Sequence, residues 1–158
     1  MARIPRLFLE NVAYHIITRG NQKQIVFPEQ EDFKKYLKML AKYVTKYQIK
    51  LYAFCLMSNH VHLAVKPNES KDMIKLMQCL NLSYTAYFNN KYNKVGHLWQ
   101  ARYLSKVLYN DAYIIGCITY IEANPVRANL VKHMQDYPFS SYRLRQLENQ
   151  TLIQIPEL

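Results

Sequence analysis

The sequence is poor in the residues that build several common kinds of site. Its only glycines, Gly20, Gly96 and Gly116, stand far apart, which excludes a glycine-rich loop for nucleotide phosphates. The three cysteines are widely spaced among apolar residues, which excludes a disulfide framework and indicates buried free thiols. No apolar run approaches the roughly 18 residues of a membrane-spanning helix. Acidic residues are also scarce, 11 against 21 Lys and Arg, so the formal net charge of +10 predicts a polyanionic partner.

What the chain does contain suits one globular domain. Half of its 158 residues are hydrophobic and 13% are aromatic, enough to bury a core. Residues 1–10 show no long apolar run, so we expect no signal peptide and a cytoplasmic location. We expect a single domain over residues 1–158, with the polar residues from about 146 to 158 as a loosely attached tail.

Hydrophobic spacing predicts an α+β fold. Alternating or continuous apolar residues predict strands at 12–18, 51–57, 60–66 and 102–108. Helical spacing predicts helices at 31–47, at 70–92 with Ser70 as N-cap, and from Asn110 or Asp111 to Asn124. The last helix is expected to stop there because a proline disfavours the α conformation in the residue before it. The order βαββαβ predicts a ferredoxin-like fold, a four-stranded antiparallel sheet with two helices on one face, plus an extra C-terminal helix.

Two histidines share one face of a predicted strand. His60 and His62 alternate with Val61, Leu63 and Val65, so the valines and leucine point beneath the two helices and the histidines point to the open face. Imidazoles about 7 Å apart along a strand can bind one divalent ion at about 2.0–2.1 Å. Without cysteine partners they suit an open site better than a closed structural zinc site. The alternative is a pair of polar residues on a solvated sheet face.

The last helix carries a tyrosine outside its main apolar stripe. That stripe is predicted to comprise Ile114, Ile115, Ile118 and Ile121, and a second stripe Tyr113, Cys117, Tyr120 and Asn124. If the helix crosses the open face of the sheet, Tyr120 and Asn124 look toward the histidines. A tyrosine beside a cation can attack a phosphodiester and become linked to it. The alternatives are a packing tyrosine and an asparagine that belongs only to a turn.

These motifs resemble a known family. Ser58-Asn59 followed by His60-Val61-His62 resembles the HUH motif of the IS200-like (Y1) transposases. Four further stretches resemble the REP-associated tyrosine transposases, in the order of that family: YHIITRGN at 14–21, GHLWQARY at 96–103, YIEANPVRA at 120–128, and YP with SSY at 137–142.

The resemblance implies a function and roles for particular residues. It implies a transposase that cleaves and rejoins single-stranded DNA near hairpin, REP-like sequences through a 5′-phosphotyrosine intermediate. Tyr120 would be the nucleophile, and His60, His62 and Asn124 would bind Mg²⁺ or Mn²⁺. No nucleotide cofactor is expected. Both a monomer and a homodimer are compatible with the family, so whether Tyr120 acts with its own chain's histidines is left open.

Basic and aromatic residues are predicted to hold the DNA. Arginines attract phosphates, and aromatic rings stack on unpaired bases. The resemblance places the N-terminal residues and the Gly-x-x-Trp-Gln segment near DNA. The predicted contacts are Arg3, Arg6, Arg19, Trp99, Gln100, Arg102, Arg127, Tyr142 and Arg143.

Three other functions are compatible with parts of the sequence. A non-catalytic hairpin-binding module would bind DNA without forming a covalent adduct. An RNA-binding ferredoxin-like domain would carry aromatic residues where this chain has His60 and His62. A simple metallohydrolase would need no tyrosine.

Overall fold

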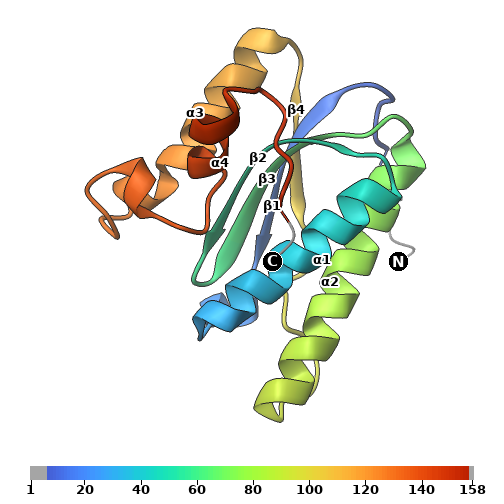
Figure 1. The fold of residues 1–158 in the computed structure, drawn as a ribbon. Helices are drawn as coiled ribbons and strands as arrows, with labels where there is room; N and C mark the ends of the chain where they lie inside the picture. The colour runs from blue at the N-terminus through green and yellow to red at the C-terminus, as the bar shows by residue number, and fades with distance from the viewer. Residues whose placement is uncertain (1–6, 157–158) are drawn as a thin grey trace.

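The computed structural model describes residues 7–156 and contains the predicted four-stranded antiparallel sheet (Figure 1). The strand order is β2-β3-β1-β4, which is the ferredoxin-like arrangement. The strands are β1 (Ala13–Arg19), β2 (Lys50–Met57), β3 (His60–Lys66) and β4 (Leu104–Leu108). The predicted fold is therefore confirmed, although β4 begins two residues later than expected.

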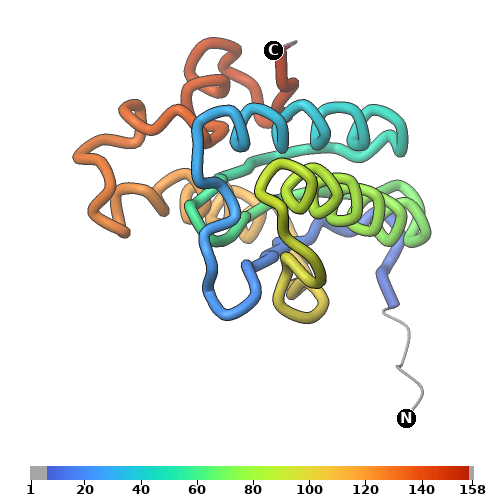
Figure 2. Tube along the Cα trace, turned by 90° about the horizontal axis from the view of Figure 1, so that it is seen from below, coloured from blue at the N-terminus to red at the C-terminus, as the bar shows by residue number. Residues whose placement is uncertain are grey.

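Helices cover both faces of the sheet. The helix α1 (Gln30–Lys46) lies beside α2 (Ser70–Tyr92) on one face, and α3 (Asp111–Arg127) lies on the other, as Figures 1 and 2 show. Three short helices complete the described chain: η1 (Asn21–Lys23), η2 (Met134–Asp136) and α4 (Tyr142–Glu148). Asn110 caps α3 through its side-chain oxygen, whereas α2 is preceded by Glu69 as N-cap and not by Ser70. No helix within residues 7–156 is long and apolar enough to cross a membrane.

The alternation predicted for β3 is confirmed. Val61, Leu63 and Val65 are fully buried in the main core, beneath α1 and α2. Tyr14 and Ile16 of β1 belong to the same core. The residues between them on each strand consequently face α3.

The face that α3 buries differs from the prediction. Ile115 is 62% exposed, whereas Cys117, Ile118 and Ile121 are buried. The sheet face beneath α3 presents small side chains, Ala13, Ala53, Cys55 and Ala64, which let the helix approach closely. Cys117 is small enough to enter that contact, and Ile115 is turned outward.

The prediction that α3 stops at Asn124 is wrong. Pro125 lies inside the helix, which continues to Arg127 and closes with a hydrogen bond from the N–H of Ala128 to the oxygen of Asn124 at 2.9 Å. A proline in the last turn removes only one helical hydrogen bond, so the turn tolerates it there. The extra turn brings Arg127 to the same side of α3 as Tyr120.

Most of residues 146–156, the described part of the expected loose tail, is exposed, but the segment is attached to the sheet at Ile153. Ile153 is buried, and its N–H donates to the oxygen of Leu51 at 2.8 Å. The attachment uses a backbone hydrogen bond and the side chains of Ile153 and Ile155, which the polar composition of the segment does not reveal.

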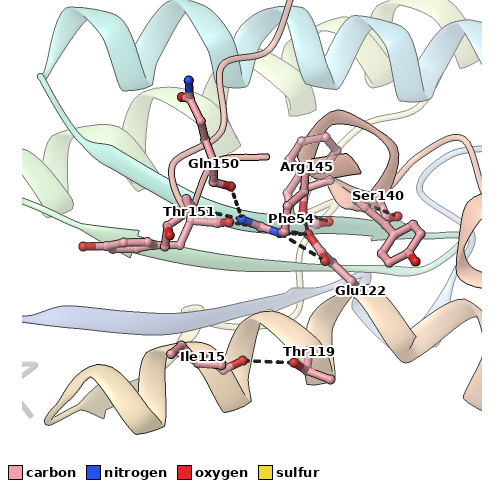
Figure 3. A network of polar contacts seen from close by, with 11 residues as sticks. Phe54, Ile115, Thr119, Glu122, Ser140, Arg145, Gln150 and Thr151 are labelled. Atoms are coloured by element: carbon pink, nitrogen blue, oxygen red, sulfur yellow. Dashed lines mark hydrogen bonds and ion pairs between the residues drawn. The ribbon is translucent and has the colours of Figure 1, made fainter. Parts of the chain in front are cut away.

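A buried ion pair ties α4 to α3 (Figure 3). Glu122 of α3 is 3% exposed and accepts hydrogen bonds from Arg145 Nη2 at 2.8 Å and Ser141 Oγ at 2.6 Å. Arg145 also donates to the backbone oxygens of Gln150 and Thr151 and to that of Tyr52 on β2. The C-terminal segment therefore fixes α3 against β2.

Candidate functional site

Three histidines meet on the sheet face that α3 crosses. His60 and His62 of β3 have ring centroids 5.0 Å apart. His15 of β1 joins them, with its Nε2 atom 2.9 Å from Nδ1 of His62. Both histidines lie on the sheet face opposite α1 and α2, as predicted, but α3 covers this face and leaves His62 only 4% exposed.

Sequence reasoning gave His15 no role. The alternation of β1 places His15 on the opposite face from Tyr14 and Ile16, a signal that the strand prediction at 12–18 contains but that was not used there. The contact with His62 also depends on the register that pairs Ile17 with His62. That register joins residues far apart in the chain, so local pattern does not reveal it.

The free atoms of His60 and His62 fit a divalent cation. Nδ1 of His60 lies 2.6 Å from Oδ1 of Asn59, and because an amide oxygen only accepts, this nitrogen carries the proton. The lone pair of His60 is then on Nε2. Within residues 7–156 no three His, Cys, Asp or Glu side chains converge as a metal site. Two imidazoles leave a cation open to substrate and water oxygens, the donors that Mg²⁺ and Mn²⁺ prefer.

The site keeps its imidazoles neutral. Burial lowers the pKa of His62 to about 3, and the neighbouring His60 and His15 and then Arg19 and Arg127 add to the effect. Burial also lowers the pKa of His15 to about 4, with Lys106 adding to the effect. The pKa of His60 is lowered by burial and by Arg19. Neutral imidazoles are metal ligands, whereas protonated ones are not.

Tyr120 lies against this cluster. Its ring centroid is 6.0 Å from that of His62 and 5.9 Å from that of His15, both edge to face. The side chain is 40% exposed, so a substrate can reach it. The guanidinium carbon of Arg127 lies 4.5 Å from the ring centroid. The phenol ring of Tyr120 therefore lies among the imidazoles of His15 and His62 and the guanidinium of Arg127.

Asn124 lies one turn after Tyr120. Its Nδ2 atom donates to the backbone oxygen of Tyr120 at 3.2 Å. This bond engages the amide nitrogen and leaves the amide oxygen as the atom suited to a cation. No hydrogen bond joins Asn124 to the histidines in the described part of the chain, and its role as a ligand stays a prediction.

Cysteines near this face are unsuited to compete with the tyrosine as nucleophiles. Cys55 and Cys117 are both buried. Burial raises the pKa of Cys55 to about 12, with Glu122 adding to the effect, and burial raises that of Cys117 to about 11. Both thiols stay protonated at neutral pH. Because only a thiolate is a strong nucleophile, neither cysteine is suited to attack a phosphodiester.

Part of the predicted DNA surface lies beside the histidines. Arg19 is opposite His60 in the β1–β3 register, and its backbone oxygen accepts from the N–H of Gln100 at 2.7 Å. Gly20 makes this junction possible, because a Cβ there would come within 2.8 Å of Val26 Cγ1. Arg102 follows in the same segment and lines a groove of about 900 Å³ between α2 and residues 96–103.

Other predicted DNA contacts lie elsewhere. Trp99 is buried and packs near Tyr36 and Tyr84, so it anchors the 96–103 segment to the core. Tyr142 lines a cavity of about 400 Å³ with Glu122, and Arg143 neighbours it on α4. This is the side of α3 away from Tyr120, beyond the β2 edge where Cys55 bridges Ser140. The structure does not bring these two residues to the histidines.

Arg3 and Arg6 lie outside the described residues.

Comparison with known proteins gives consistent matches. The family described as "Transposase IS200 like" matches residues 8–124. A Haemophilus influenzae protein (strain ATCC 51907 / DSM 11121 / KW20 / Rd), assigned as a REP-associated tyrosine transposase, is 24% identical over 140 residues, or 82% of this chain and 77% of its own.

Solved structures share the fold. A REP-associated tyrosine transposase bound to a REP hairpin superposes with a TM-score of 0.75 and 17% identity, covering 100% of this chain and 93% of its own. A Deinococcus radiodurans R1 protein described as a transposase gives a TM-score of 0.51 and 18% identity, covering 77% of this chain and 96% of its own.

Proposed function

Because the chain belongs to the IS200-like transposase family, whose members cleave and transfer DNA strands, we propose that it cleaves and rejoins single-stranded DNA next to hairpins. The proposed intermediate is a 5′-phosphotyrosine on Tyr120. One observation carries the proposal: the ring of Tyr120 lies 6.0 Å from that of His62, part of a neutral histidine pair with atoms suited to a cation. The relative bound to a REP hairpin supports a hairpin substrate of the same kind.

The chemistry assigns one role to each group. The phenolic oxygen of Tyr120 attacks the phosphorus, an O–P bond forms, and the bond from phosphorus to the 3′-oxygen breaks. The 3′-oxygen leaves with a proton as a free hydroxyl, and the phenolic proton passes to solvent. Attack by a second DNA 3′-hydroxyl reverses these bonds and frees the tyrosine. The phosphodiester energy is kept in the adduct, so no nucleotide cofactor is needed.

His60 and His62 would hold Mg²⁺ or Mn²⁺ through Nε2, with the amide oxygen of Asn124 as the third protein ligand. The cation would polarise a phosphoryl oxygen and orient the scissile group. Arg127, on the same side as Tyr120, would face the phosphate that the tyrosine attacks.

The DNA is proposed to pass the end of β1. Arg19, Gln100 and Arg102 lie along one path from the histidines to the groove beside α2. Arginines there neutralise phosphates, and the exposed amide of Gln100 is free to face bases. Arg3 and Arg6 remain predicted contacts on the sequence alone, as do Tyr142 and Arg143.

A covalent-adduct assay tests the proposal. Labelled single strands that carry a hairpin, taken from DNA flanking the gene, are incubated with the protein and Mg²⁺ or Mn²⁺ and run on a denaturing gel. We expect an adduct that is lost in Tyr120→Phe, in His60→Ala and with a chelator. Tyr113→Phe is the matched control, since Tyr113 is exposed on the same helix, and it should keep the adduct.

Other outcomes would identify the alternatives. Cleavage by Tyr120→Phe at the wild-type rate would indicate a metallohydrolase. Tight hairpin binding with no adduct on any flanking strand would indicate a binding module.

A further inference from the structure

We propose that His15 is a positioning residue that fixes the ring tautomer of His62 and thereby presents Nε2 of His62 as the cation-binding atom. The inference deepens the proposed function and rests on it for the cation. The observation is the 2.9 Å contact between Nε2 of His15 and Nδ1 of His62. In that contact one nitrogen must donate and the other must accept, so the two rings determine each other's tautomers.

Surroundings of His62 leave His15 as the partner of its Nδ1. His62 is 4% exposed, so solvent has little access to the ring. The two rings are inclined by only 28°, with centroids 5.2 Å apart, and they come from adjacent strands held by the β1–β3 ladder. The register thus holds the two side chains as diagonal neighbours on one face of the sheet.

In each of the two histidines, His60 and His62, the Nδ1 atom has a hydrogen-bond partner and Nε2 is left for the cation. Asn59 occupies Nδ1 of His60, at 2.6 Å, and His15 occupies Nδ1 of His62. When Nδ1 of His62 donates, its lone pair is on Nε2, as in His60. His15 then accepts through Nε2 and carries its own proton on Nδ1. Hydrogen bonds to the second ring nitrogen orient metal-binding histidines in this manner.

His15 acts through His62 and is not a third ligand. Its Nε2 atom is already engaged with His62, and within residues 7–156 no three His, Cys, Asp or Glu side chains converge on one metal position. A further role for His15 is contact with the nucleophile, since its ring centroid lies 5.9 Å from that of Tyr120. One side chain therefore helps to place both the cation site and the tyrosine.

Two substitutions of His15 test separately its hydrogen bond to His62 and the packing of its ring. His15→Phe keeps a flat ring against His62 and Tyr120 but cannot accept a hydrogen bond. His15→Gln loses the ring but keeps an acceptor that can reach Nδ1 of His62. Thermal melting of both variants establishes that each is folded before the other measurements are read.

The first readout is the tautomer of His62 without metal. Long-range ¹H–¹⁵N correlation spectra report which ring nitrogen carries the proton, and His62→Gln identifies the signals. We expect Nδ1–H in the wild type and in His15→Gln, and loss of that single tautomer in His15→Phe. An Nε2–H tautomer in the wild type, or an unchanged spectrum in His15→Phe, would overturn the inference.

The second readout is Mn²⁺ affinity of the free protein, followed by the electron paramagnetic resonance of unbound Mn²⁺. Loss of such an outer partner weakens metal binding about 10- to 100-fold. We expect that loss in His15→Phe and a smaller one in His15→Gln. Equal affinity of His15→Phe and the wild type would overturn the role of His15. Equal affinity of His60→Ala and the wild type would instead contradict the proposed cation site, and the tautomer spectra would still decide the role of His15.

Discussion

Arg127 illustrates how a single side chain can affect the proposed chemistry without being the nucleophile. Its guanidinium carbon lies 4.5 Å from the ring centroid of Tyr120, and the two residues sit about two helical turns apart on α3. A cation over a tyrosine ring contributes roughly 0.5–2 kcal/mol. We expect the same charge to lie near the phosphate that Tyr120 would attack.

We predict that Arg127→Ala slows single-turnover adduct formation about tenfold at saturating DNA, because about 1.4 kcal/mol corresponds to a factor of ten. Arg127→Lys should recover part of the rate, since it keeps the charge without the planar group. Lys38→Ala removes one positive charge from an exposed position on α1, outside the predicted DNA contacts, and is the control. A rate for Arg127→Ala equal to that of the control would show that Arg127 does not assist the reaction.

Among single residues, the sequence predicted correctly which ones are neighbours on the same strand or the same helix. His60 and His62 are two residues apart on one strand, and Tyr120 and Asn124 are one turn apart on one helix. His15 required the β1–β3 register, and the burial of Trp99 required its packing near Tyr36 and Tyr84. Both are consequences of contacts between segments distant in the chain.

Among the elements, α1 and α2 are joined by a buried carboxylate. Asp32 near the start of α1 is 0% exposed and accepts from Tyr87, Lys91 and Tyr92 of α2 at 2.8, 2.9 and 2.6 Å. Burial by itself would raise the pKa of Asp32, but the hydrogen bonds from these residues and from the N–H of Glu29 hold it below its ordinary value. The charged form is therefore the one that the fold stabilises.

This pKa shift gives a pH dependence with a definite sign. A carboxylate with a lowered folded-state pKa contributes fully above its unfolded value, about 3.9, and its contribution is lost as the pH falls through the lower folded value. We predict that Asp32→Asn loses about 3 kcal/mol of unfolding free energy at neutral pH, with a flatter decline in acid than the wild type. Urea unfolding at a series of pH values measures both. Asp136→Asn, at an exposed position, should match the wild type, and an equally steep acid decline in Asp32→Asn would refute the assignment.

The position of α3 depends on the Glu122–Arg145 pair. Removing one partner of a buried ion pair costs roughly 3–5 kcal/mol because the other charge stays buried. We predict that Glu122→Ala loses about 3 kcal/mol of unfolding free energy by urea denaturation and also slows adduct formation, since Tyr120 is on the same helix. Glu148→Ala, at an exposed position on α4, is the control for removing a carboxylate. Wild-type stability in Glu122→Ala would contradict a structural role for the pair.

Element prediction succeeded where the hydrophobic period was long and failed at ends and faces. The 17-residue α1 and the 23-residue α2 follow their predicted ranges to within one residue. For α3, Pro125 led to a predicted end at Asn124, whereas the helix ends at Arg127. The predicted apolar stripe included Ile115, which is exposed, and omitted Cys117, which is buried. The small side chains on the sheet face determine which side of α3 is buried, and the sequence of α3 alone does not contain this information.

For the whole molecule, the described chain holds every group of the proposed reaction in one copy. Tyr120 is adjacent to His62 and His15 of the same chain, and the Glu122–Arg145 pair fastens α3 to that chain's own β2. This placement favours attack by Tyr120 beside the histidines of its own chain. The sequence left this point open, because a helix of this kind could equally have packed on a second copy.

We predict that mixing Tyr120→Phe with His60→Ala restores no adduct formation, because neither chain has both groups at one site. The measurement is the adduct yield of the mixture after joint unfolding and refolding, compared with wild type treated identically. In an equal mixture, recovery approaching a quarter of the wild-type yield would show that the tyrosine acts across two subunits, because half of the randomly formed dimers are mixed and each of these has one complete site.

The attachment of α3 also determines at which stage of its synthesis a new chain can acquire the proposed activity. Domains begin to fold while synthesis proceeds from the N-terminus. The sheet strands and the helix with Tyr120 are complete at residue 127, but Arg145 and the residues that bridge to β2 emerge later. A nascent chain on the ribosome would thus expose the nucleophile on a helix that is not yet fastened. We therefore expect the proposed cleavage activity only after Arg145 has emerged and has closed its contact with Glu122.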